Sequence, residues 1–366
     1  MNNYRASNFK KFVLTVGVIA ASLISLAPIA GAVAPARPYG DVQVLGTFPT
    51  PPGFPEGIAV KGNKAYVAGP ARFGTTGTGA SAVVAFDTLG GGIVRVYPTQ
   101  GENLLAEHAN SCVAFDGQGR LYVLNTQLGL YRLDTGSGLQ ESYSTPFPDL
   151  PACSASAPPC SPTVADAPAL PNDIAFDEAG NAYVTDSMQA TIWRVPAGGG
   201  TPQIWFQDAR FDSPFVGANG IRLSPDRTRV FLSVTTDLMG GAYIYTLPLA
   251  AAPQAGDLEV FRQFGPGDLP DGIAFGKSGN LYVTIATPFA SGIVVLDPAG
   301  AEVSRLTNPA GSPIFPYDSP ANAAFDGHGS LLVTNHAFAT MIPTQFTVLD
   351  VYVGDTASPL AKPMLP

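Results

Sequence analysis

The stretch LPNDIAFDEAGNAYVTDS, residues 170–187, indicates the fold of this chain. It opens on the polar pair Asn172 and Asp173, continues as an alternating apolar run, passes an acidic turn with a glycine, and ends in a second apolar run. Two such runs around a short turn are typical of a β-hairpin. The stretch is one copy of a repeat, so the fold follows from how often it recurs.

The hairpin pattern occurs six times, and further strand-like runs follow each copy. Each unit predicts about four strands over roughly 50 residues, a period that indicates a propeller or another closed array. We therefore expect an all-β, six-bladed propeller with four-stranded blades. The copies begin EGIAVKGNKAYVA at Glu56, SCVAFDGQGRLYVLN at Ser111, NDIAFDEAGNAYVTD at Asn172, NGIRLSPDRTRVFLSV at Asn219, DGIAFGKSGNLYVTI at Asp271 and ANAAFDGHGSLLVTN at Ala321.

A ring of blades needs a strand that joins its two ends. Residues 344–353 can supply outer strands for the sixth blade, and residues 41–48 can add one from the amino-terminal side. Closure of this kind removes sheet edges that would otherwise pair with other chains. We therefore expect residues 33–366 to form a single propeller domain.

One connection is long. Residues 134–169, rich in Pro, Ser and Ala, are expected to form a loop between the second and third blades, and they contain Cys153 and Cys160. In an oxidising compartment these two cysteines could form a disulfide. Cys112 would then remain as a buried strand residue.

The amino-terminal residues 1–32 have the pattern of a secretory signal peptide. Arg5, Lys10 and Lys11 precede an apolar run, and small residues at 30–32 suit cleavage by a signal peptidase. A retained membrane anchor is the alternative interpretation. The pattern predicts export to the periplasm or the extracellular space.

The chain without this segment is strongly acidic. The segment carries three of the 19 basic residues and none of the 28 acidic ones, which leaves a formal charge of −12. Such a balance argues against nucleic acid and anionic membrane surfaces as partners. The 40 glycines and 35 prolines favour short strands joined by turns.

Alignment of the copies brings one polar position into register at the head of each. Because the inner strand of a propeller blade lines the central channel, these heads should ring its mouth. Two carboxylates and two amides among them are hard oxygen donors that suit calcium or another divalent cation. Turn capping explains a single Asn or Asp equally well, but four in register favour a metal. From first to sixth copy the column reads Glu56, Ser111, Asn172, Asn219, Asp271, Ala321.

The motifs FPEGIAV, LPNDIAF, GANGIRL and LPDGIAF, in this order, resemble the senescence marker protein/gluconolactonase family of six-bladed propellers, of the regucalcin type, and more distantly the paraoxonases. The resemblance covers nearly the whole mature chain. In those families a Glu, two Asn and an Asp in this order bind a catalytic calcium ion. The resemblance therefore implies that Glu56, Asn172, Asn219 and Asp271 are metal ligands here.

The resemblance leaves the substrate open. Gluconolactonases of this family carry an arginine two residues before the first of these asparagines, and this chain has Leu170 there. A sugar lactone is therefore not an obvious substrate. Paraoxonases work with a pair of histidines near the metal, and the candidates here are His108 and His336.

Topology indicates which other residues could approach the metal. The second strand of each hairpin returns to the channel mouth, so Asn125, Asp186 and His336 are expected near the pocket rim. His108 lies in the segment that leads into the second blade. Asp173, beside a predicted ligand, could also reach the rim or bond the backbone. A surface or loop role is the alternative interpretation for both histidines.

Together with the family resemblance, these observations predict a secreted, calcium-dependent hydrolase of lactone or ester bonds. The ion would polarise the carbonyl and stabilise the developing oxyanion. The resemblance to the family implies that Asp271 acts both as ligand and as the base that activates water, with His108 and His336 as other candidate bases. We expect a monomer that acts on a small molecule, with neither nucleic acid nor, after signal cleavage, a membrane as partner.

Alternatives from other classes remain. A non-catalytic secreted propeller would bind a protein, a glycan or a small ligand, with calcium in a structural role. A propeller similar to strictosidine synthase would need a catalytic glutamate near the channel, for which we find no candidate. The sequence lacks a G-x-S-x-G motif, which argues against a common serine hydrolase. The Gly/Thr segment 74–79 lacks the lysine of a phosphate loop and is expected to be a flexible turn.

Overall fold

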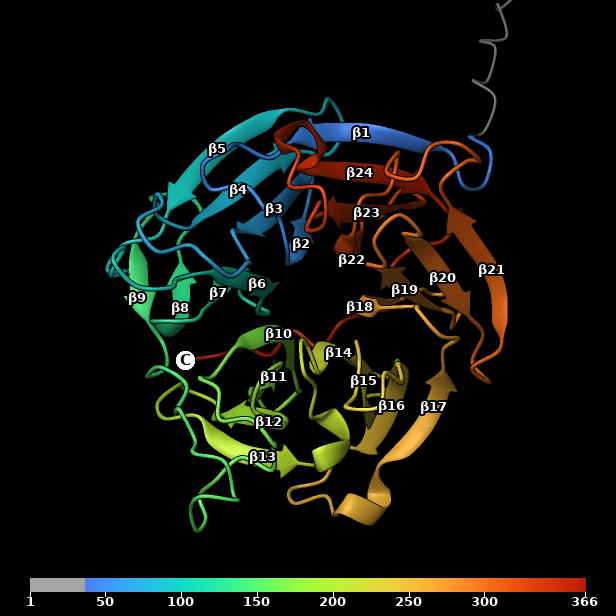
Figure 1. The fold of residues 1–366 in the computed structure, drawn as a ribbon. Coiled ribbons are helices and arrows are strands. Elements are labelled where there is room, and N and C mark those ends of the chain that lie inside the picture. Colours follow the sequence, from blue (N-terminus) through green and yellow to red (C-terminus); the bar gives the residue numbers. More distant parts are fainter. Residues whose placement is uncertain (1–36) are drawn as a thin grey trace, which may run out of the picture. The chain divides into compact units, whose positions relative to one another are not determined.

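The structure is a computed structural model that describes residues 37–366, so the predicted signal segment 1–32 lies outside the described residues. Residues 37–366 form six four-stranded sheets, arranged as blades around a common centre (Figure 1). This arrangement confirms the predicted all-β, six-bladed propeller.

Each blade has an inner, a second, a third and an outer strand. The inner strands are β2 (Ile58–Lys61), β6 (Asn110–Phe115), β10 (Pro171–Phe176), β14 (Ala218–Leu223), β18 (Pro270–Phe275) and β22 (Pro320–Phe325). The second strands are β3 (Lys64–Gly69), β7 (Leu121–Asn125), β11 (Ala182–Asp186), β15 (Arg229–Val234), β19 (Leu281–Ile285) and β23 (Ser330–Asn335).

The third strands are β4 (Ala82–Asp87), β8 (Gly129–Leu133), β12 (Thr191–Val195), β16 (Tyr243–Pro248), β20 (Gly292–Leu296) and β24 (Thr347–Tyr352). The outer strands are β5 (Ile93–Pro98), β9 (Gln140–Ser142), β13 (Gln203–Gln207), β17 (Glu259–Gln263), β21 (Glu302–Thr307) and β1 (Val42–Thr47). Short 3₁₀ helices lie in the connections at η1 (Ala209–Phe211), η2 (Ala255–Asp257) and η3 (Pro343–Gln345). Within residues 37–366, no helix has the length and hydrophobicity needed to span a membrane.

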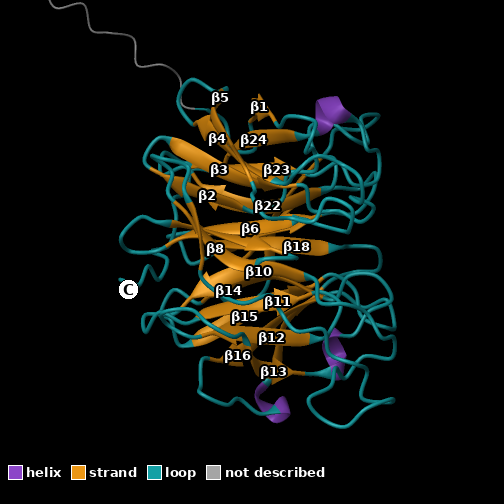
Figure 2. Cartoon of the chain, turned by 90° about the vertical axis from the view of Figure 1, so that its left-hand side faces the viewer, coloured by secondary structure: helices purple, strands orange, loops and turns teal. Residues whose placement is uncertain are grey.

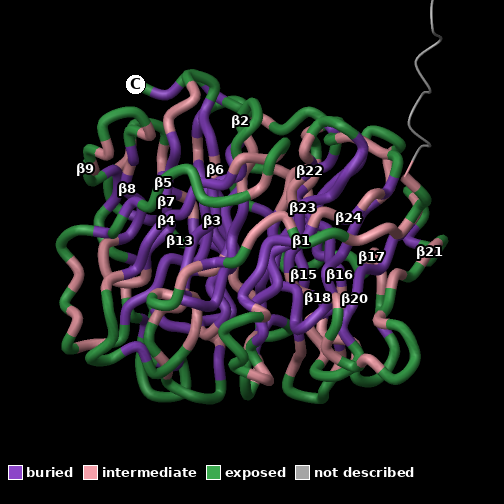
Figure 3. Tube along the Cα trace, turned by 90° about the horizontal axis from the view of Figure 1, so that it is seen from above, coloured by how far each residue is buried: buried purple, intermediate pink, exposed green. Residues whose placement is uncertain are grey.

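The hydrophobic core is divided into six clusters, each between two adjacent blades. Successive residues of a strand point to opposite faces of its sheet, so each blade supplies side chains to two clusters. In β11, Tyr183 packs toward the fourth blade and Val184 toward the second. Burial on both faces explains why such strands are nearly continuous in apolar residues. Figure 3 shows buried segments in the strands and exposed ones mainly in the loops.

The ring closes in the sixth blade, where strands from both ends of the described chain meet. β1 supplies the outer strand and pairs antiparallel with β24. The guanidinium of Arg37 donates hydrogen bonds to the carboxylates of Asp41 (2.7 Å) and Asp350 (2.8 Å), which ties this end to the sheet. The expectation that residues 41–48 and 344–353 join the ends of the ring is confirmed.

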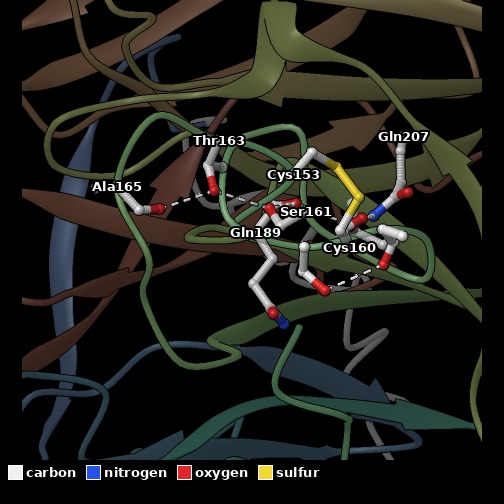
Figure 4. Close-up of a disulfide and its surroundings, with 10 residues drawn as sticks. Cys153, Cys160, Ser161, Thr163, Ala165, Gln189 and Gln207 are labelled. Carbon is white, nitrogen blue, oxygen red and sulfur yellow. Dashed lines mark hydrogen bonds between the residues drawn. A yellow bond between two sulfur atoms is a disulfide. The ribbon is translucent and has the colours of Figure 1, made fainter. Parts of the chain in front are cut away.

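The connection expected as a loop over residues 134–169 contains one strand. β9 pairs with β8 and completes the second blade, so the irregular part begins after residue 142. A strand of three polar residues has no apolar alternation that would reveal it in the sequence. Beyond it, a disulfide joins Cys153 and Cys160, and the Ser161 hydroxyl donates a hydrogen bond to the backbone carbonyl of Gln189 (2.8 Å; Figure 4). The loop is thereby attached to the third blade.

One end of the channel is crossed by the final segment of the chain. The backbone N–H of Ser358 donates to the carbonyl of Phe275 (2.9 Å), and Gly117 N–H donates to the carbonyl of Pro363 (2.8 Å). Leu365 is then buried in the core cluster between the second and third blades. The segment leads to the C terminus on the left-hand face in Figure 2. The inner strands end at this mouth and begin at the other one, where the polar heads of the repeats lie.

Candidate functional site

The predicted metal ligands lie where the inner strands are irregular. In β10, β14 and β18 the pairing with the second strand is interrupted after the first residue, and these interruptions contain Asn172, Asn219 and Asp271. A β-bulge redirects side chains at the point where it interrupts the ladder. Three of the four predicted ligands therefore share one backbone irregularity at the same end of the channel. Glu56 comes just before β2.

The residue after three of these heads is glycine, which lets neighbouring inner strands approach closely. A Cβ atom on Gly220 would lie 2.6 Å from the carbonyl oxygen of Asp271, and one on Gly272 would lie 2.6 Å from that of Ala321. Separations this short are sterically forbidden, so a larger residue would displace the adjacent bulge. The close approach brings heads from different blades into one site.

The four predicted ligands line one cavity of about 260 Å³. Glu56 and Asn219 are buried, and Asn172 and Asp271 are partly buried. The structure thus brings together side chains from the first, third, fourth and fifth blades. Ser111, the head of the second copy, also lines the cavity, whereas Ala321 of the sixth copy does not.

Three buried oxygen atoms in this cavity have unused hydrogen-bonding capacity. Within residues 37–366, no group donates a hydrogen bond to the Oδ1 atoms of Asn172, Asn219 or Asp271. The Nδ2 group of Asn219 donates to the hydroxyl of Thr235 (2.9 Å), so the opposite oxygen faces away from that partner. Buried acceptors without partners cost free energy. Hard oxygen atoms left in this way fit a divalent cation such as calcium.

The amide oxygens are essential to such a site. In the part of the chain that the structure describes, no group of three or more His, Cys, Asp or Glu side chains is arranged to hold a metal ion. The candidate site has only two carboxylates, from Glu56 and Asp271. Its fit to a cation therefore depends on the oxygens of Asn172 and Asn219.

The two carboxyl groups are costly to ionise without a counter-charge. Burial raises the pKa of Glu56 well above its usual range, and repulsion from Asp271 and Asp173 raises it further. Burial also raises the pKa of Asp271, again with repulsion from Asp173. A bound divalent cation would favour the ionised form of both groups.

His336 lines the same cavity. Its Nε2 atom lies 2.7 Å from the carbonyl oxygen of Ala71 and 3.7 Å from Oε2 of Glu56. Burial lowers the pKa of His336 to about 4. The imidazole is therefore neutral near pH 7, and its Nε2–H donates to the Ala71 carbonyl.

His108 is buried and does not line the cavity. Its Nδ1 atom lies 2.9 Å from the carbonyl oxygen of Ala106, and its Nε2 atom lies 3.0 Å from that of Gly79. Both ring nitrogens thus face backbone carbonyls. These contacts give His108 a structural position and leave His336 as the histidine beside the candidate site.

The structure does not place Asn125 and Asp186 at the pocket rim, where we predicted them, and it gives Asp173 the alternative predicted role, because its carboxylate accepts a hydrogen bond from the backbone N–H of Ile174 (2.8 Å). All three are fully buried and lie outside the cavity lining. The side-chain oxygen of Asn125 accepts hydrogen bonds from backbone N–H groups of the following turn. Asp186 accepts them from the Trp193 indole (3.0 Å) and the Leu170 backbone (3.0 Å). Polar residues at the ends of second strands fix turns here, because the turn leaves N–H groups without ladder partners.

Asp173 belongs to a buried polar cluster in the channel. Its carboxylate accepts hydrogen bonds from Nη1 of Arg222 (2.6 Å) and from the thiol of Cys112 (2.8 Å). Nη2 of Arg222 donates to Oδ1 of Asn322 (3.1 Å). An arginine from the fourth blade thus neutralises an aspartate from the third. The residues after the heads form a second column that could have revealed most of this cluster: Gly57, Cys112, Asp173, Gly220, Gly272, Asn322.

Hydroxyl groups on the second strands tie the third, fourth and fifth blades each to the next blade. The hydroxyl of Ser233 donates to the carbonyl oxygen of Asp271 (2.5 Å), and that of Thr185 donates to the carbonyl of Asn219. These bonds hold the backbone of two candidate ligands. A Ser or Thr recurs in YVTD, FLSV and YVTI and was visible in the sequence. Its role could not be predicted there, because the carbonyl that accepts its hydrogen bond belongs to the next blade.

The segment 74–79, expected as a flexible turn, is held by one carboxylate. Glu107 accepts hydrogen bonds from three backbone N–H groups of this segment (2.8, 3.0 and 3.3 Å) and from the hydroxyl of Thr76 (2.6 Å). Although partial burial opposes the shift, these hydrogen bonds lower the pKa of Glu107 to about 2. Phe73, which lines the cavity, directly precedes the segment. Glu107 therefore positions part of the cavity wall.

Three comparisons with known proteins agree with this fold. Residues 75–336 match the model of the SMP-30/Gluconolactonase/LRE-like region. A gluconolactonase from Zymomonas mobilis is 27% identical over 177 residues, which are 44% of this chain and 46% of that enzyme. The match thus spans less than half of the enzyme.

Two solved structures share the fold. Regucalcin from Agrobacterium tumefaciens, described as a calcium-binding protein, has a TM-score of 0.61 at 17% identity, over 89% of this chain and 98% of that one. Luciferin-regenerating enzyme has a TM-score of 0.58 at 14% identity, over 89% of this chain and 100% of that one. The family match covers Asn172, Asn219 and Asp271, and it begins after Glu56. The chain belongs to the SMP-30/gluconolactonase/LRE-like family.

Proposed function

We propose that this chain hydrolyses lactones or related esters with the help of a divalent cation, calcium first, held by Glu56, Asn172, Asn219 and Asp271. The observation that carries the proposal is the set of three buried oxygens in one cavity that find no partner within residues 37–366. The gluconolactonase-like family supports the reaction, and the calcium-binding regucalcin shares the fold. The signal pattern and the disulfide support action outside the cytoplasm.

When bound, the cation would polarise the ester carbonyl and stabilise negative charge on its oxygen. Glu56 and Asp271 supply the negative charges that hold it. Asp271 is also the candidate base, because it lines the cavity and its carboxylate can accept a proton from water beside the ester. The hydroxyl of Ser233 fixes its backbone. His336, held against the Ala71 carbonyl, is the second candidate.

Metal analysis and hydrolysis assays test this function together. The purified protein is assayed on a panel of lactones and aryl esters before and after chelation. We expect chelation to abolish turnover and calcium to restore it. Asp271→Ala should lose turnover and most of the calcium-dependent rise in Tm, because binding to the folded state alone stabilises it. Asp149→Ala, an exposed carboxylate outside the cavity, is the matched control.

Two results would overturn the proposal. Full turnover by Asp271→Ala would show that this residue is not needed in the site. Turnover that survives chelation would show that the reaction does not need the cation. Calcium-dependent stability without turnover of any ester would instead favour the non-catalytic propeller.

A further inference from the structure

The cavity has walls of a different chemical character from its floor. The floor presents the carboxylate and amide oxygens of the four candidate ligands, whereas the walls are mainly apolar. We propose, on the basis of the hydrolase function proposed above, that the substrate is a lactone or ester with an alkyl or aryl substituent and not a polyhydroxylated sugar lactone. The apolar wall residues include Leu170, Val216, Leu269, Phe73, Phe215 and Phe338.

The polar side chains in the walls already have partners in the protein. The hydroxyl of Ser111 donates to a backbone carbonyl of the third blade (2.7 Å), and that of Thr235 to one of the fifth (2.8 Å). The Thr126 hydroxyl accepts a hydrogen bond from a backbone N–H (2.9 Å), and His336 is bound to a backbone carbonyl (2.7 Å). Arg72 donates to carbonyls of its own loop. A sugar hydroxyl that enters the cavity would find the donors of Ser111, Thr235 and His336 engaged, whereas Arg72 uses only two of its five N–H donors.

This arrangement separates the two kinds of substrate energetically. A hydroxyl group taken from water without a new partner weakens binding by about fivefold, at the low end of the measured penalties. A methylene group moved from water to apolar surroundings strengthens binding by about fourfold. The walls therefore disfavour a polyol and favour an alkyl chain. Both effects act in the same direction when a lactone with an alkyl chain is compared with a sugar lactone.

Three phenylalanines keep large exposed areas at the cavity mouth. The exposed fractions are 48% for Phe73, 42% for Phe215 and 37% for Phe338. They come from a loop of the first blade, the connection from the third blade to the fourth, and a loop of the sixth blade, so apolar surface borders the mouth on several sides. Phe338 also stacks on His336 with ring centres 5.8 Å apart, which continues the apolar surface to the floor. Exposed apolar surface gathered at a cavity marks a binding site for an apolar group.

The test compares lactones that share a six-membered ring and differ in substituent. δ-Valerolactone has none, δ-decalactone has a pentyl chain, and glucono-δ-lactone has hydroxyl groups. With the calcium-loaded protein, and after correction for spontaneous hydrolysis, we expect kcat/KM to rise more than about tenfold from δ-valerolactone to δ-decalactone. Glucono-δ-lactone should be the poorest substrate. Equal values for the first two, or a preference for glucono-δ-lactone, would overturn this inference and leave the hydrolase function intact.

Variants of Phe215 connect the selectivity to the wall. In Phe215→Asn, the ratio of kcat/KM for δ-decalactone to that for δ-valerolactone should fall about tenfold, because apolar contact is replaced by a polar group. Phe215→Leu should restore most of the ratio. Leu139→Ala, at an exposed apolar residue (71%) outside the cavity, is the matched control and should leave the ratio unchanged. If the ratio of kcat/KM values is the same in all variants, Phe215 does not contribute to the selectivity.

Binding of ketones that cannot be hydrolysed separates this inference from the hydrolase function. Calorimetry compares 2-pentylcyclohexanone with cyclohexanone. If no lactone is turned over, the hydrolase function fails, and tighter binding of the pentyl ketone that is lost in Phe215→Asn would still support an apolar binding site. Equal binding of the two ketones, or none, would overturn the site as well.

Discussion

The ring of Phe215 packs edge-on against the ring of Phe338, with ring centres 5.7 Å apart and planes inclined by 63°. Phe215 lies in the connection that leads from the third blade into the fourth, and Phe338 lies in a loop of the sixth blade, which is not a neighbour of either. The contact therefore lies outside the cores that hold adjacent blades together. It shapes the mouth of the cavity into which Asp271 of the intervening blade projects.

This contact should be measurable as a coupling energy. Aromatic pairs in this geometry contribute about 0.5–1.5 kcal/mol beyond the area that they bury. A double-mutant cycle with Phe215→Ala and Phe338→Ala, followed by urea denaturation, should show a coupling in the lower half of this range, because both rings are partly exposed. Strict additivity of the two single changes would show that the pair does not hold the two loops together.

Asn172→Leu should have opposite effects on stability without and with calcium. In the cation-free protein the change removes a buried oxygen without a partner within residues 37–366, so the free energy of unfolding should stay constant or rise by about 1 kcal/mol. With calcium, the variant should lose much of the rise in Tm that the wild-type protein gains, because one ligand is missing. Thermal unfolding in chelator and in calcium measures both effects. Equal shifts under the two conditions would argue against Asn172 as a ligand.

Arg222→Met should strongly destabilise the propeller. The Asp173 side chain is fully buried and that of Arg222 is 11% exposed, so loss of the arginine leaves an unpaired charge in the channel. Removal of one partner from a buried pair costs about 3–5 kcal/mol. The double variant Asp173→Asn/Arg222→Met should recover most of the lost stability. Urea denaturation of the three variants checks this, and a double variant as unstable as the single one would point to packing instead.

Gly220→Ala should disturb the site through the backbone. The added methyl group would lie 2.6 Å from the carbonyl oxygen of Asp271, so the bulge that carries this ligand must move. Overpacking of this kind costs about 1–3 kcal/mol, and turnover should fall as well. Gly256→Ala, where the added atom meets no neighbour within 4 Å, is the control and should change stability by less than about 0.5 kcal/mol. Identical behaviour of the two variants would show that the inner strands can move apart freely.

Glu107→Gln should reveal its effect through pH. The pKa of Glu107 in the folded protein is lowered to about 2 from an ordinary value of 4.5. Because folding lowers the pKa, the ionised carboxylate stabilises the fold fully at pH values above its ordinary pKa of 4.5. This contribution is lost as the pH falls toward 2. The stability difference between wild type and variant should therefore be constant above about pH 5 and shrink below it. Denaturation curves between pH 2.5 and pH 7 measure this, and a difference independent of pH would exclude the carboxylate as its cause.

Much of the fold could be predicted from the sequence because it is encoded locally. Alternation of apolar residues, a turn with glycine and a second apolar run define each hairpin within a short stretch, and six copies define a ring. The same register of repeats predicts the closing strand. It also predicts that the four heads with side-chain oxygens gather in one cavity, namely Glu56, Asn172, Asn219 and Asp271. β9 was missed because its three polar residues carry no local signal.

The polar contacts around the site could not be predicted in this way. Asp186 and Asn125 look like rim residues in the sequence, yet the structure uses them to satisfy backbone N–H groups in turns. Arg222 is not a head residue, and only the packing of the fourth blade against the third brings it to Asp173. These contacts depend on pairs of residues far apart in the chain.

The sequence by itself therefore determined the propeller, its number of blades and a column of oxygen donors, because strand alternation and turn geometry act over a few residues. Only the tertiary structure decided that the donors sit on bulges with unsatisfied oxygens, and that Phe215 and Phe338 meet above an apolar cavity. The physical reason is that a wall is made where loops from different blades touch, and no local pattern specifies which loops will do so.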